Sequence, residues 1–136
     1  MTCVVDSSVA VKWYLAEPDH EAALRLLMRG DRLVAPDLIL VELANVAWKR
    51  VQRGEIDAMF GRGMVAELIA GDVELLRSAD LADAALEIAI DLGHPVYDCF
   101  YLACAQAQGL AVVTADRRLA ARVAGTPYGR LVQPLA

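Results

Sequence analysis

Short apolar runs alternate with longer amphipathic segments along the chain. Runs rich in valine and leucine predict strands, while segments whose apolar residues recur with a helical period predict helices. Strands are predicted over residues 2–5, 32–35, 73–76 and 110–114, with an edge strand at 131–133. Helices are predicted over 9–15, from Pro18 and Asp19 to a stop at Gly30, from 36–37 to 53, over 56–70, from a cap at Ser78 or Asp80 to 92, over 94–105, and over 116–123.

This alternation predicts an α/β fold built on a parallel sheet. The length of 136 residues suits a single domain, residues 1–136, that buries a substantial core. Gly61 and Gly63 weaken the helix predicted over 56–70, because glycine is a poor helix former. The sequence contains no internal repeat, low-complexity tract or linker.

The segment 94–105 is apolar on every side apart from one acid. Between residues 96 and 105, Asp98 is the only charged residue, and a helix that is apolar all round is normally buried. A buried carboxylate is costly unless it is paired, hydrogen-bonded or bound to a metal ion. Because this segment supplies no partner, we expect other parts of the chain to meet Asp98.

Two further acids directly follow predicted strands. Asp6 ends the run 2–5, and Asp116 follows the run 110–114. The carboxyl ends of parallel strands meet at one edge of a sheet, where ligands bind, so both carboxylates are predicted at the same edge. Each alone is explained somewhat better as the N-cap of the following helix. Together with the isolated acid at position 98, the pair favours a functional site.

Glu42 is the fourth candidate, as the one charge in the apolar run 38–44. Asn45 lies three residues later on the same face of the predicted helix. The alternative is a glutamate on the solvent side of an amphipathic helix, but the run 38–43 leaves little room for such a side. Since glutamate is rarely buried without a partner, we favour a functional role.

Four carboxylates that converge without basic partners repel one another, and a divalent cation removes this repulsion. Oxygen ligands suit Mg²⁺ or Mn²⁺ better than zinc. Such a site suits phosphodiester hydrolysis, in which a divalent ion orients and activates water and neutralises the growing charge on phosphate. Glu42 or Asp116 is the candidate for positioning that water or accepting its proton. His20 and His94 lack metal-ligand spacing, so structural roles are expected for both.

The charge balance limits how nucleic acid can bind. The formal net charge is −5 and the isoelectric point is near 4.9, which argues against binding by bulk charge alone. Local basic residues are candidates for RNA contact, although solvated helix faces explain them equally well. These candidates are Arg117, Arg118, Arg122, Lys49, Arg50 and Arg53. Hydroxyls of Ser7, Ser8 and Thr114 either hold a water or phosphate oxygen or serve as helix caps.

Cys3, Cys99 and Cys104 have apolar neighbours and form no Cys-x-x-Cys pair. Buried reduced thiols in a cytoplasmic protein are therefore expected, in preference to a zinc site or a disulfide. No apolar run approaches the roughly 20 residues of a membrane span, and the N-terminus lacks the pattern of a signal peptide.

The apolar content is high, with 57% hydrophobic residues and a mean hydropathy of +0.40. This suggests a sheet covered on both faces or a subunit interface. Trp13, Tyr14 and Trp48 are accordingly expected to pack against a core or a partner in preference to stacking on bases.

Four motifs occur in a specific order over residues 3–119. They are Val-Val-Asp-Ser-Ser near the N-terminus, Val-Glu-Leu-Ala-Asn-Val around residue 42, Tyr-Asp-Cys-Phe-Tyr-Leu-Ala-Cys-Ala from residue 97, and Val-Thr-Ala-Asp-Arg-Arg-Leu from residue 113. Each motif alone is weak, but together they resemble the PIN domain, most closely its VapC toxin branch. The resemblance implies a three-layer sandwich with a mostly parallel central sheet of four to five strands flanked by helices.

The resemblance also implies a metal-dependent endoribonuclease that uses Mg²⁺ or Mn²⁺. The family's acidic positions fall on Asp6, Glu42, Asp98 and Asp116, which are the catalytic candidates. Asp6 and Asp98 are then the principal ligands of the metal ion, with Asp116 binding it directly or through a neighbouring group. The residues expected to contact substrate are Ser8, Thr114 and Arg117.

The family further implies a homodimer and a VapB-like antitoxin whose C-terminal segment covers the acidic groove. Its substrates are structured RNAs, including transfer and ribosomal RNA. The alternative is a catalytically silent PIN-like module that binds RNA or protein. Receiver domains and haloacid-dehalogenase phosphatases fit less well, because the run after the first strand has no Asp-x-Asp and no lysine follows Lys49.

Overall fold

The computed structural model describes residues 2–71 and 73–135, within which five parallel strands form one sheet. The strands are β1 (Thr2–Val5), β2 (Arg32–Pro36), β3 (Val73–Leu76), β4 (Val112–Thr114) and β5 (Val132–Pro134). Their order across the sheet is β3-β2-β1-β4-β5, and every neighbouring pair runs parallel. This confirms the predicted parallel sheet, with β5 at one edge.

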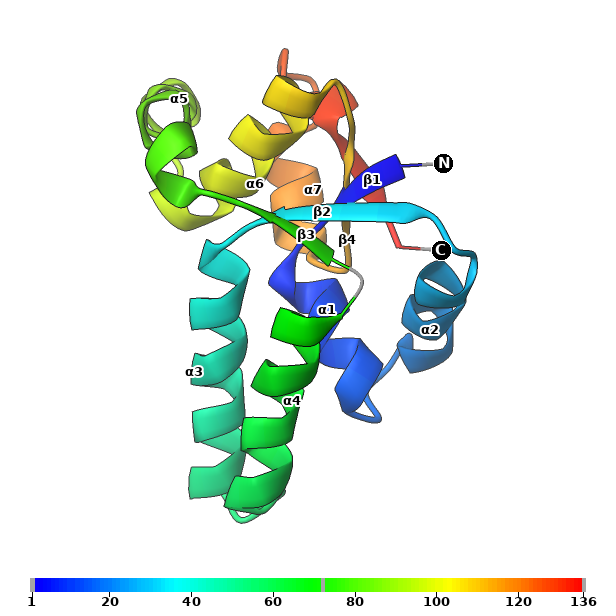
Figure 1. Ribbon diagram of the computed structural model, residues 1–136. Coiled ribbons are helices and arrows are strands. Elements are labelled where there is room, and N and C mark those ends of the chain that lie inside the picture. Colours follow the sequence, from blue (N-terminus) through cyan, green and yellow to red (C-terminus); the bar gives the residue numbers. More distant parts are fainter. Residues whose placement is uncertain (1, 72, 136) are drawn as a thin grey trace.

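Helices cover both faces of the sheet, as Figure 1 shows. They are α1 (Ser7–Tyr14), α2 (His20–Met28), α3 (Leu38–Gln52), α4 (Ala58–Ala70), α5 (Ser78–Leu92), α6 (Val96–Gln108) and α7 (Arg117–Val123), followed by the short 3-10 helix η1 (Gly129–Leu131). In Figure 1, α1 to α4 lie below the sheet, and α5 and α6 lie above it. The expected three-layer α/β fold is confirmed.

The direction of the chain reverses between β3 and β4. The first three strands step away from β1 in one direction, and the chain then returns through α5 and α6 to place β4 on the other side of β1. Because connections between parallel strands are right-handed, this reversal puts the later helices on the opposite face. The point between β1 and β4 is therefore the switch point at which open α/β sheets bind ligands.

The central strand β1 is buried on both faces. Cys3, Val4 and Val5 expose 2% or less of their surface, and Tyr101 and Leu102 of α6 are equally buried. A strand covered from both sides is apolar on both faces, which is why Cys3, Val4 and Val5 show no alternation of apolar and polar residues. The three cysteines are free and buried, as predicted.

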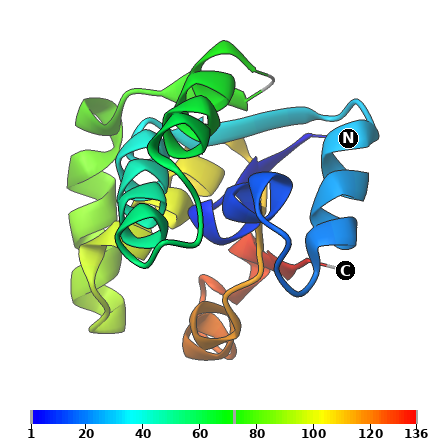
Figure 2. The same ribbon diagram turned by 90° about the horizontal axis from the view of Figure 1, so that it is seen from below.

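The helices α3 and α4 form an antiparallel pair that extends away from the sheet (Figure 1), and Figure 2 looks along this pair from below. Gly61 lies where the two helices meet, since a Cβ atom there would stand 3.4 Å from Val51 and 3.6 Å from Ala47. The glycines at 61 and 63 therefore do not interrupt α4, and the first of them allows close packing.

The helices α3 and α5 begin beside each other and cap one another. The Asp37 carboxylate accepts the backbone N–H of Ser78 at 3.0 Å and the Ser78 hydroxyl at 2.5 Å. In return the Ser78 hydroxyl oxygen accepts the backbone N–H of Leu38 at 3.2 Å. The prediction that Ser78 or Asp80 caps α5 was wrong, because the capping carboxylate comes from the end of the neighbouring strand β2.

Other departures from the predicted elements are small. Asp6 caps α1, so this helix begins at Ser7 and not at residue 9. The helix α2 buries Ala22, Ala23 and Leu26, while Met28 at its end is 82% exposed. Within the described residues, no helix combines the length and apolar character needed to cross a membrane.

Replacing Asp37 by alanine should destabilise the fold by about 1 to 2 kcal/mol, because α5 loses its cap and the Ser78 hydroxyl loses its acceptor. Urea unfolding measures the change. Asp57→Ala is the matched control, since Asp57 caps α4 through one bond, to the backbone N–H of Phe60. An equal or smaller loss in Asp37→Ala than in this control would contradict reciprocal capping.

Candidate active site

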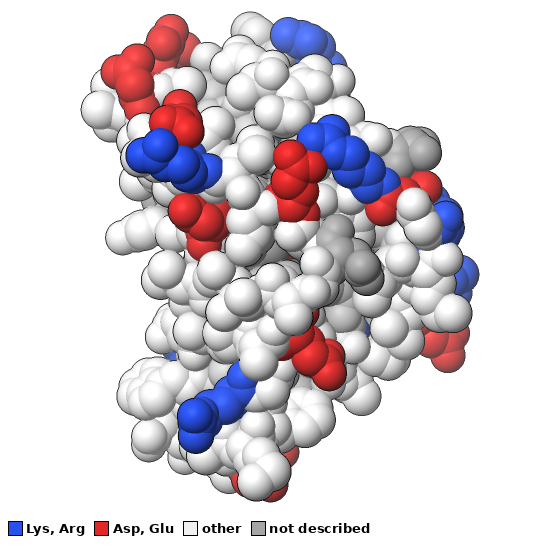
Figure 3. All heavy atoms as spheres, in the orientation of Figure 1, with Lys and Arg blue, Asp and Glu red and all other residues white. Residues whose placement is uncertain are grey.

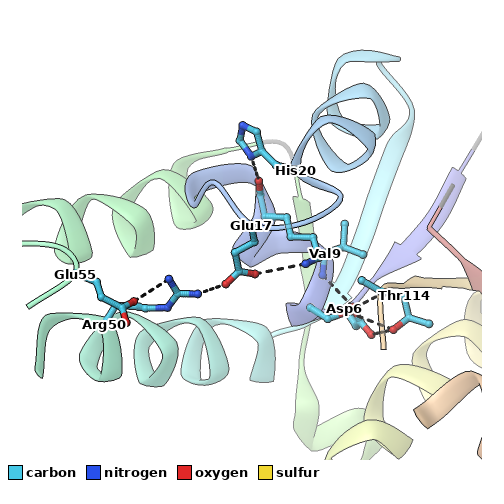
Figure 4. A network of polar contacts seen from close by, with 10 residues as sticks. Asp6, Val9, Glu17, His20, Arg50, Glu55 and Thr114 are labelled. Carbon is cyan, nitrogen blue, oxygen red and sulfur yellow. Dashed lines mark hydrogen bonds and ion pairs between the residues drawn. The ribbon is translucent and has the colours of Figure 1, made fainter. Parts of the chain in front are cut away.

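Asp6 occupies the carboxyl end of β1, where the strand becomes α1. One carboxylate oxygen, Oδ1, accepts the Ser8 hydroxyl at 2.5 Å and the backbone N–H of Val9 at 3.2 Å. The other oxygen, Oδ2, accepts the hydroxyl of Thr114 at the end of the neighbouring strand β4. Figure 4 shows Asp6 and Thr114 pointing toward one another. The side chain of Asp6 is thereby fixed from both strands.

The two hydroxyls are themselves held in place by the backbone. The Ser8 oxygen accepts the N–H of Ala115 at 3.0 Å, and the Thr114 oxygen accepts the N–H of Asp116 at 2.9 Å. Each hydroxyl therefore accepts from the loop after β4 and directs its own hydrogen at Asp6. Asp6 and Thr114 are buried, at 5% and 2% exposure.

Burial raises the pKa of Asp6 to about 6, and the negative charge of Asp98 adds to this shift. The hydrogen bonds from Ser8, Thr114 and Val9 act in the opposite direction, because they favour the ionised form. Burial and Asp98 therefore disfavour the charged form of Asp6, while the three hydrogen-bond donors favour it.

Glu42 lies on α3 and is half-buried beside α6. Its carboxylate accepts the hydroxyl of Tyr101, a side chain that is 1% exposed. Burial raises the pKa of Glu42, the charge of Asp98 raises it further, and hydrogen bonds from Tyr101 and Ser7 lower it. Burial also raises the pKa of Tyr101, so this phenol stays protonated and donates to the glutamate.

Asp98 lies in the first turn of α6 and is half-exposed, with 34% of its side chain accessible. Its Oδ2 atom lies 2.7 Å from Nε2 of His94, four residues earlier. The expectation that the segment supplies no partner for Asp98 was therefore wrong. The spacing of four residues at a helix start was the available signal.

Asp116 caps α7, and its Oδ1 accepts the backbone N–H groups of Arg118 at 2.9 Å and Leu119 at 3.2 Å. It stands at the end of β4, beside the end of β1, so the predicted placement of Asp6 and Asp116 at one sheet edge is confirmed. The link between these two acids passes through Thr114, which contacts both. The capping alternative also applies to each of them.

Asp98 lies near enough to both Asp6 and Glu42 for its charge to raise the pKa of each. All three side chains are oxygen donors, and in the described part of the chain no lysine or arginine forms an ion pair with them. Donor type and charge therefore suit a hard divalent cation.

The number of converging ligands also bears on the type of metal. No three His, Cys, Asp or Glu side chains in the described ranges are close enough to hold a metal ion by themselves. Zinc requires three or four protein ligands, whereas Mg²⁺ is commonly bound through one or two carboxylates together with water and substrate phosphates. The residues present thus fit Mg²⁺ or the similar Mn²⁺ and do not form a zinc site.

The basic candidates divide into engaged and exposed side chains. Arg50 lies between Glu17 and Glu55, with an ion pair to each, as Figure 4 shows. Arg122 donates to the backbone carbonyl groups of Leu92 and Gly93. The remaining candidates, which are exposed, are Lys49, Arg53, Arg117 and Arg118.

The aromatic side chains considered for packing or base stacking differ in how far they are buried. Trp13 is buried, and its indole N–H donates to the carbonyl of Ala23 at 2.9 Å, so the predicted packing against a core is confirmed. Its ring meets that of Tyr14 edge to face. Trp48, in contrast, is 57% exposed on α3.

Comparisons with known proteins identify the family of this fold. The family model for the PIN domain matches residues 3–125. Ribonuclease VapC3 of Pyrobaculum aerophilum is 32% identical over 88% of this chain and 93% of its own length. Ribonuclease VapC9 of Mycobacterium tuberculosis is 32% identical over 85% of this chain and 87% of its own. The chain therefore belongs to the PIN-domain family and, within it, to the VapC group.

A solved structure supports the same fold. VapC20 of Mycobacterium tuberculosis, described as a toxin that cleaves the sarcin–ricin loop, superposes with a TM-score of 0.69 at 18% identity, covering 94% of this chain and 98% of its own. At this identity the likeness establishes the fold alone.

Asp6→Asn should raise the free energy of unfolding at pH 7.5 by about 1 to 3 kcal/mol in the presence of a chelator. The folded protein retains the Asp6 proton up to about pH 6, whereas the unfolded chain releases it near 3.8. The resulting stability is present below pH 4 and is lost as the pH rises through 6, so the gain from asparagine shrinks at low pH. Urea unfolding at pH 4 and 7.5 measures both values, and a variant less stable than wild type at pH 7.5 would contradict this reasoning.

Proposed function

We propose that this protein is a divalent-metal-dependent endoribonuclease and the toxin of a toxin–antitoxin pair. The observation that carries the proposal is the buried Asp6 carboxylate at the switch point of a PIN fold, with the charge of Asp98 acting on both Asp6 and Glu42. The naming of the VapC relatives as ribonucleases supports the same activity. A cytoplasmic location is part of the proposal and agrees with three unpaired thiols.

Asp6 and Asp98 are the proposed ligands of Mg²⁺ or Mn²⁺, with Asp116 beside them. A bound divalent ion supplies positive charge for the phosphate and lowers the pKa of water. Asp6 keeps a fixed orientation through its hydroxyl partners, and Asp98 is accessible enough to meet substrate. Glu42 is the proposed acceptor of a proton from water, because its raised pKa makes the carboxylate more basic. The hydroxyl of Tyr101 orients it.

RNA is the proposed substrate class. Arg117 and Arg118 are exposed at the start of α7, next to Asp116, and can bind phosphate at the same sheet edge. Ser8 and Thr114 were expected to contact substrate. Their hydroxyls donate to Asp6, and Thr114 is buried, which favours a role in holding Asp6.

A VapB-like antitoxin is the proposed protein partner. A chain of VapBC2 from Rickettsia felis, solved in complex with a DNA fragment of its promoter, superposes with a TM-score of 0.69 at 15% identity, covering all of both chains. The chain described here has a groove of about 470 Å³ between its helices α3 and α4. The groove is lined by Trp48, Val51, Val65 and Ile69 among others. Figure 3 shows few charged side chains over this pair. Such a groove suits the apolar face of a helical segment.

A homodimer is proposed through α5 and α6. Leu86 and Ile90 lie one turn apart on α5 and are 54% and 71% exposed, and Tyr97 at the start of α6 is 62% exposed. Large apolar side chains grouped on adjoining helices are typical of a subunit interface.

Ile90→Glu should convert the dimer to a monomer, because a charge would be buried at the interface. Light scattering coupled to size-exclusion chromatography measures the mass. Met28→Glu, at an exposed apolar position on α2, should leave the mass unchanged. A wild-type chain that is monomeric at all concentrations would rule out this assembly.

Asp98→Asn should reduce Mn²⁺-dependent RNA cleavage about 100-fold or more, since losing a metal ligand removes several kcal/mol of transition-state stabilisation. Cleavage of a structured RNA, with and without EDTA, provides the measurement. Asp83→Asn, an exposed acid on α5, is the matched control and should cleave normally.

The alternative is a catalytically silent module that binds RNA or protein. It predicts RNA binding that is unchanged by EDTA, with no cleavage by wild type under any metal condition. Cleavage that survives both EDTA and Asp98→Asn would contradict the metal-dependent mechanism.

A further inference from the structure

The side chain of His94 is the partner of Asp98. The 2.7 Å contact joins Nε2 of the imidazole to Oδ2 of the carboxylate, and 17% of the histidine side chain is exposed against 34% for the aspartate. Across residues 2–71 and 73–135, Asp98 makes no other side-chain hydrogen bond or ion pair. One carboxylate oxygen is therefore occupied by His94, and Oδ1 is left for another ligand.

The backbone of His94 is placed independently of Asp98. Gly93 ends α5 in the left-handed conformation, at φ 62°, and the N–H of His94 then donates to the carbonyl of Ala89 at 3.2 Å. The guanidinium of Arg122 donates to the carbonyls of Leu92 and Gly93 and so ties this turn to α7. The imidazole is thus presented to α6 from a turn that is already fixed.

Asp98 needs such a donor because of its surroundings. Its charge opposes those of Asp6 and Glu42, and its half-exposed position at the start of α6 leaves room for the carboxylate to rotate away from them. A hydrogen bond from a fixed imidazole opposes this rotation. Partners of this kind commonly orient metal-binding carboxylates and tune their affinity.

We propose that His94 is a positioning residue that holds Asp98 in the orientation that binds a divalent cation. The proposal rests on the metal-dependent nuclease function proposed above. In it, His94 binds neither the metal ion nor RNA, because its Nε2 atom is engaged with Asp98. It acts through the carboxylate alone.

The test compares two substitutions, measured by titration calorimetry with Mn²⁺. His94→Phe keeps the ring but removes the donor, and should weaken Mn²⁺ binding about 10- to 100-fold. His94→Gln, whose amide can donate from about the same place, should recover most of the affinity. RNA cleavage by the phenylalanine variant should require more Mn²⁺ but approach the wild-type maximum once the metal is saturating.

His20→Phe is the matched control. Nδ1 of His20 lies 2.5 Å from the carbonyl oxygen of Lys12, and Figure 4 shows it apart from Asp6, so this change should leave Mn²⁺ affinity unchanged. Thermal unfolding reports any general loss of stability, and if His94→Phe does not fold, His94→Ala carries the same expectation without the bulk of the ring.

The proposal is overturned if the wild type binds Mn²⁺ and cleaves RNA while His94→Phe binds Mn²⁺ equally well. It is also overturned if glutamine impairs binding as much as phenylalanine, because the donor would then be irrelevant. In either case the nuclease function stands. A folded wild type that takes up no Mn²⁺ and cleaves no RNA overturns the nuclease function and the role of His94 together.

Discussion

A buried carboxylate at the junction of β1 and β4 is the constraint on which the site depends. Asp6 is 5% exposed, and burying an acid is costly unless its oxygens are hydrogen-bonded. Hydroxyls of Ser8 and Thr114 meet those oxygens, and the backbone after β4 fixes both hydroxyls. A shift of β4 against β1 would separate the Thr114 hydroxyl from Asp6 and the Ala115 N–H from Ser8. Strand register and site geometry are therefore held together by the same bonds.

Further negative charge lies close to Asp6, although burial already disfavours the ionised form of that side chain. Asp98 raises the pKa of Asp6 and of Glu42, so its charge opposes the ionisation of both acids in the absence of a cation. Fixed donors counter this: Tyr101 holds Glu42, and His94 holds Asp98. Retaining such a cluster against its cost in stability is typical of a functional site, where activity and stability conflict.

The sequence was sufficient to predict the helices, the strands and the sheet edge that carries the acids. It was insufficient to predict which side chains form hydrogen bonds with those acids. Periodicity and caps located the helices, and the rule for parallel strands placed Asp6 and Asp116 at one edge. The bonds from Tyr101 to Glu42 and from Thr114 to Asp6 depend on side-chain orientation between distant segments, which no local pattern reports. His94 was different, because its spacing of four residues from Asp98 was visible in the sequence.

Reciprocal capping by Asp37 and Ser78 was not predictable for a related reason. It depends on β2 and β3 being neighbours that end side by side, and strand order emerges only in the folded chain. The pairing of Arg50 with Glu17 is likewise a contact between segments far apart in the sequence. Each of these contacts changes how a residue is interpreted, without altering the predicted fold.

Charge at the sheet edge links the proposed metal and RNA binding. Arg50 is neutralised by two glutamates and Arg122 is bound to carbonyl groups, which leaves Arg117 and Arg118 as the free cations beside Asp116 among the candidates considered. At physiological salt, charges beyond about 8 Å are largely screened, so the overall charge of −5 matters less than the nearest groups. Phosphate meets repulsion from the acids unless a cation offsets it. Under the proposed function, metal and RNA therefore each strengthen the binding of the other, as thermodynamic linkage requires.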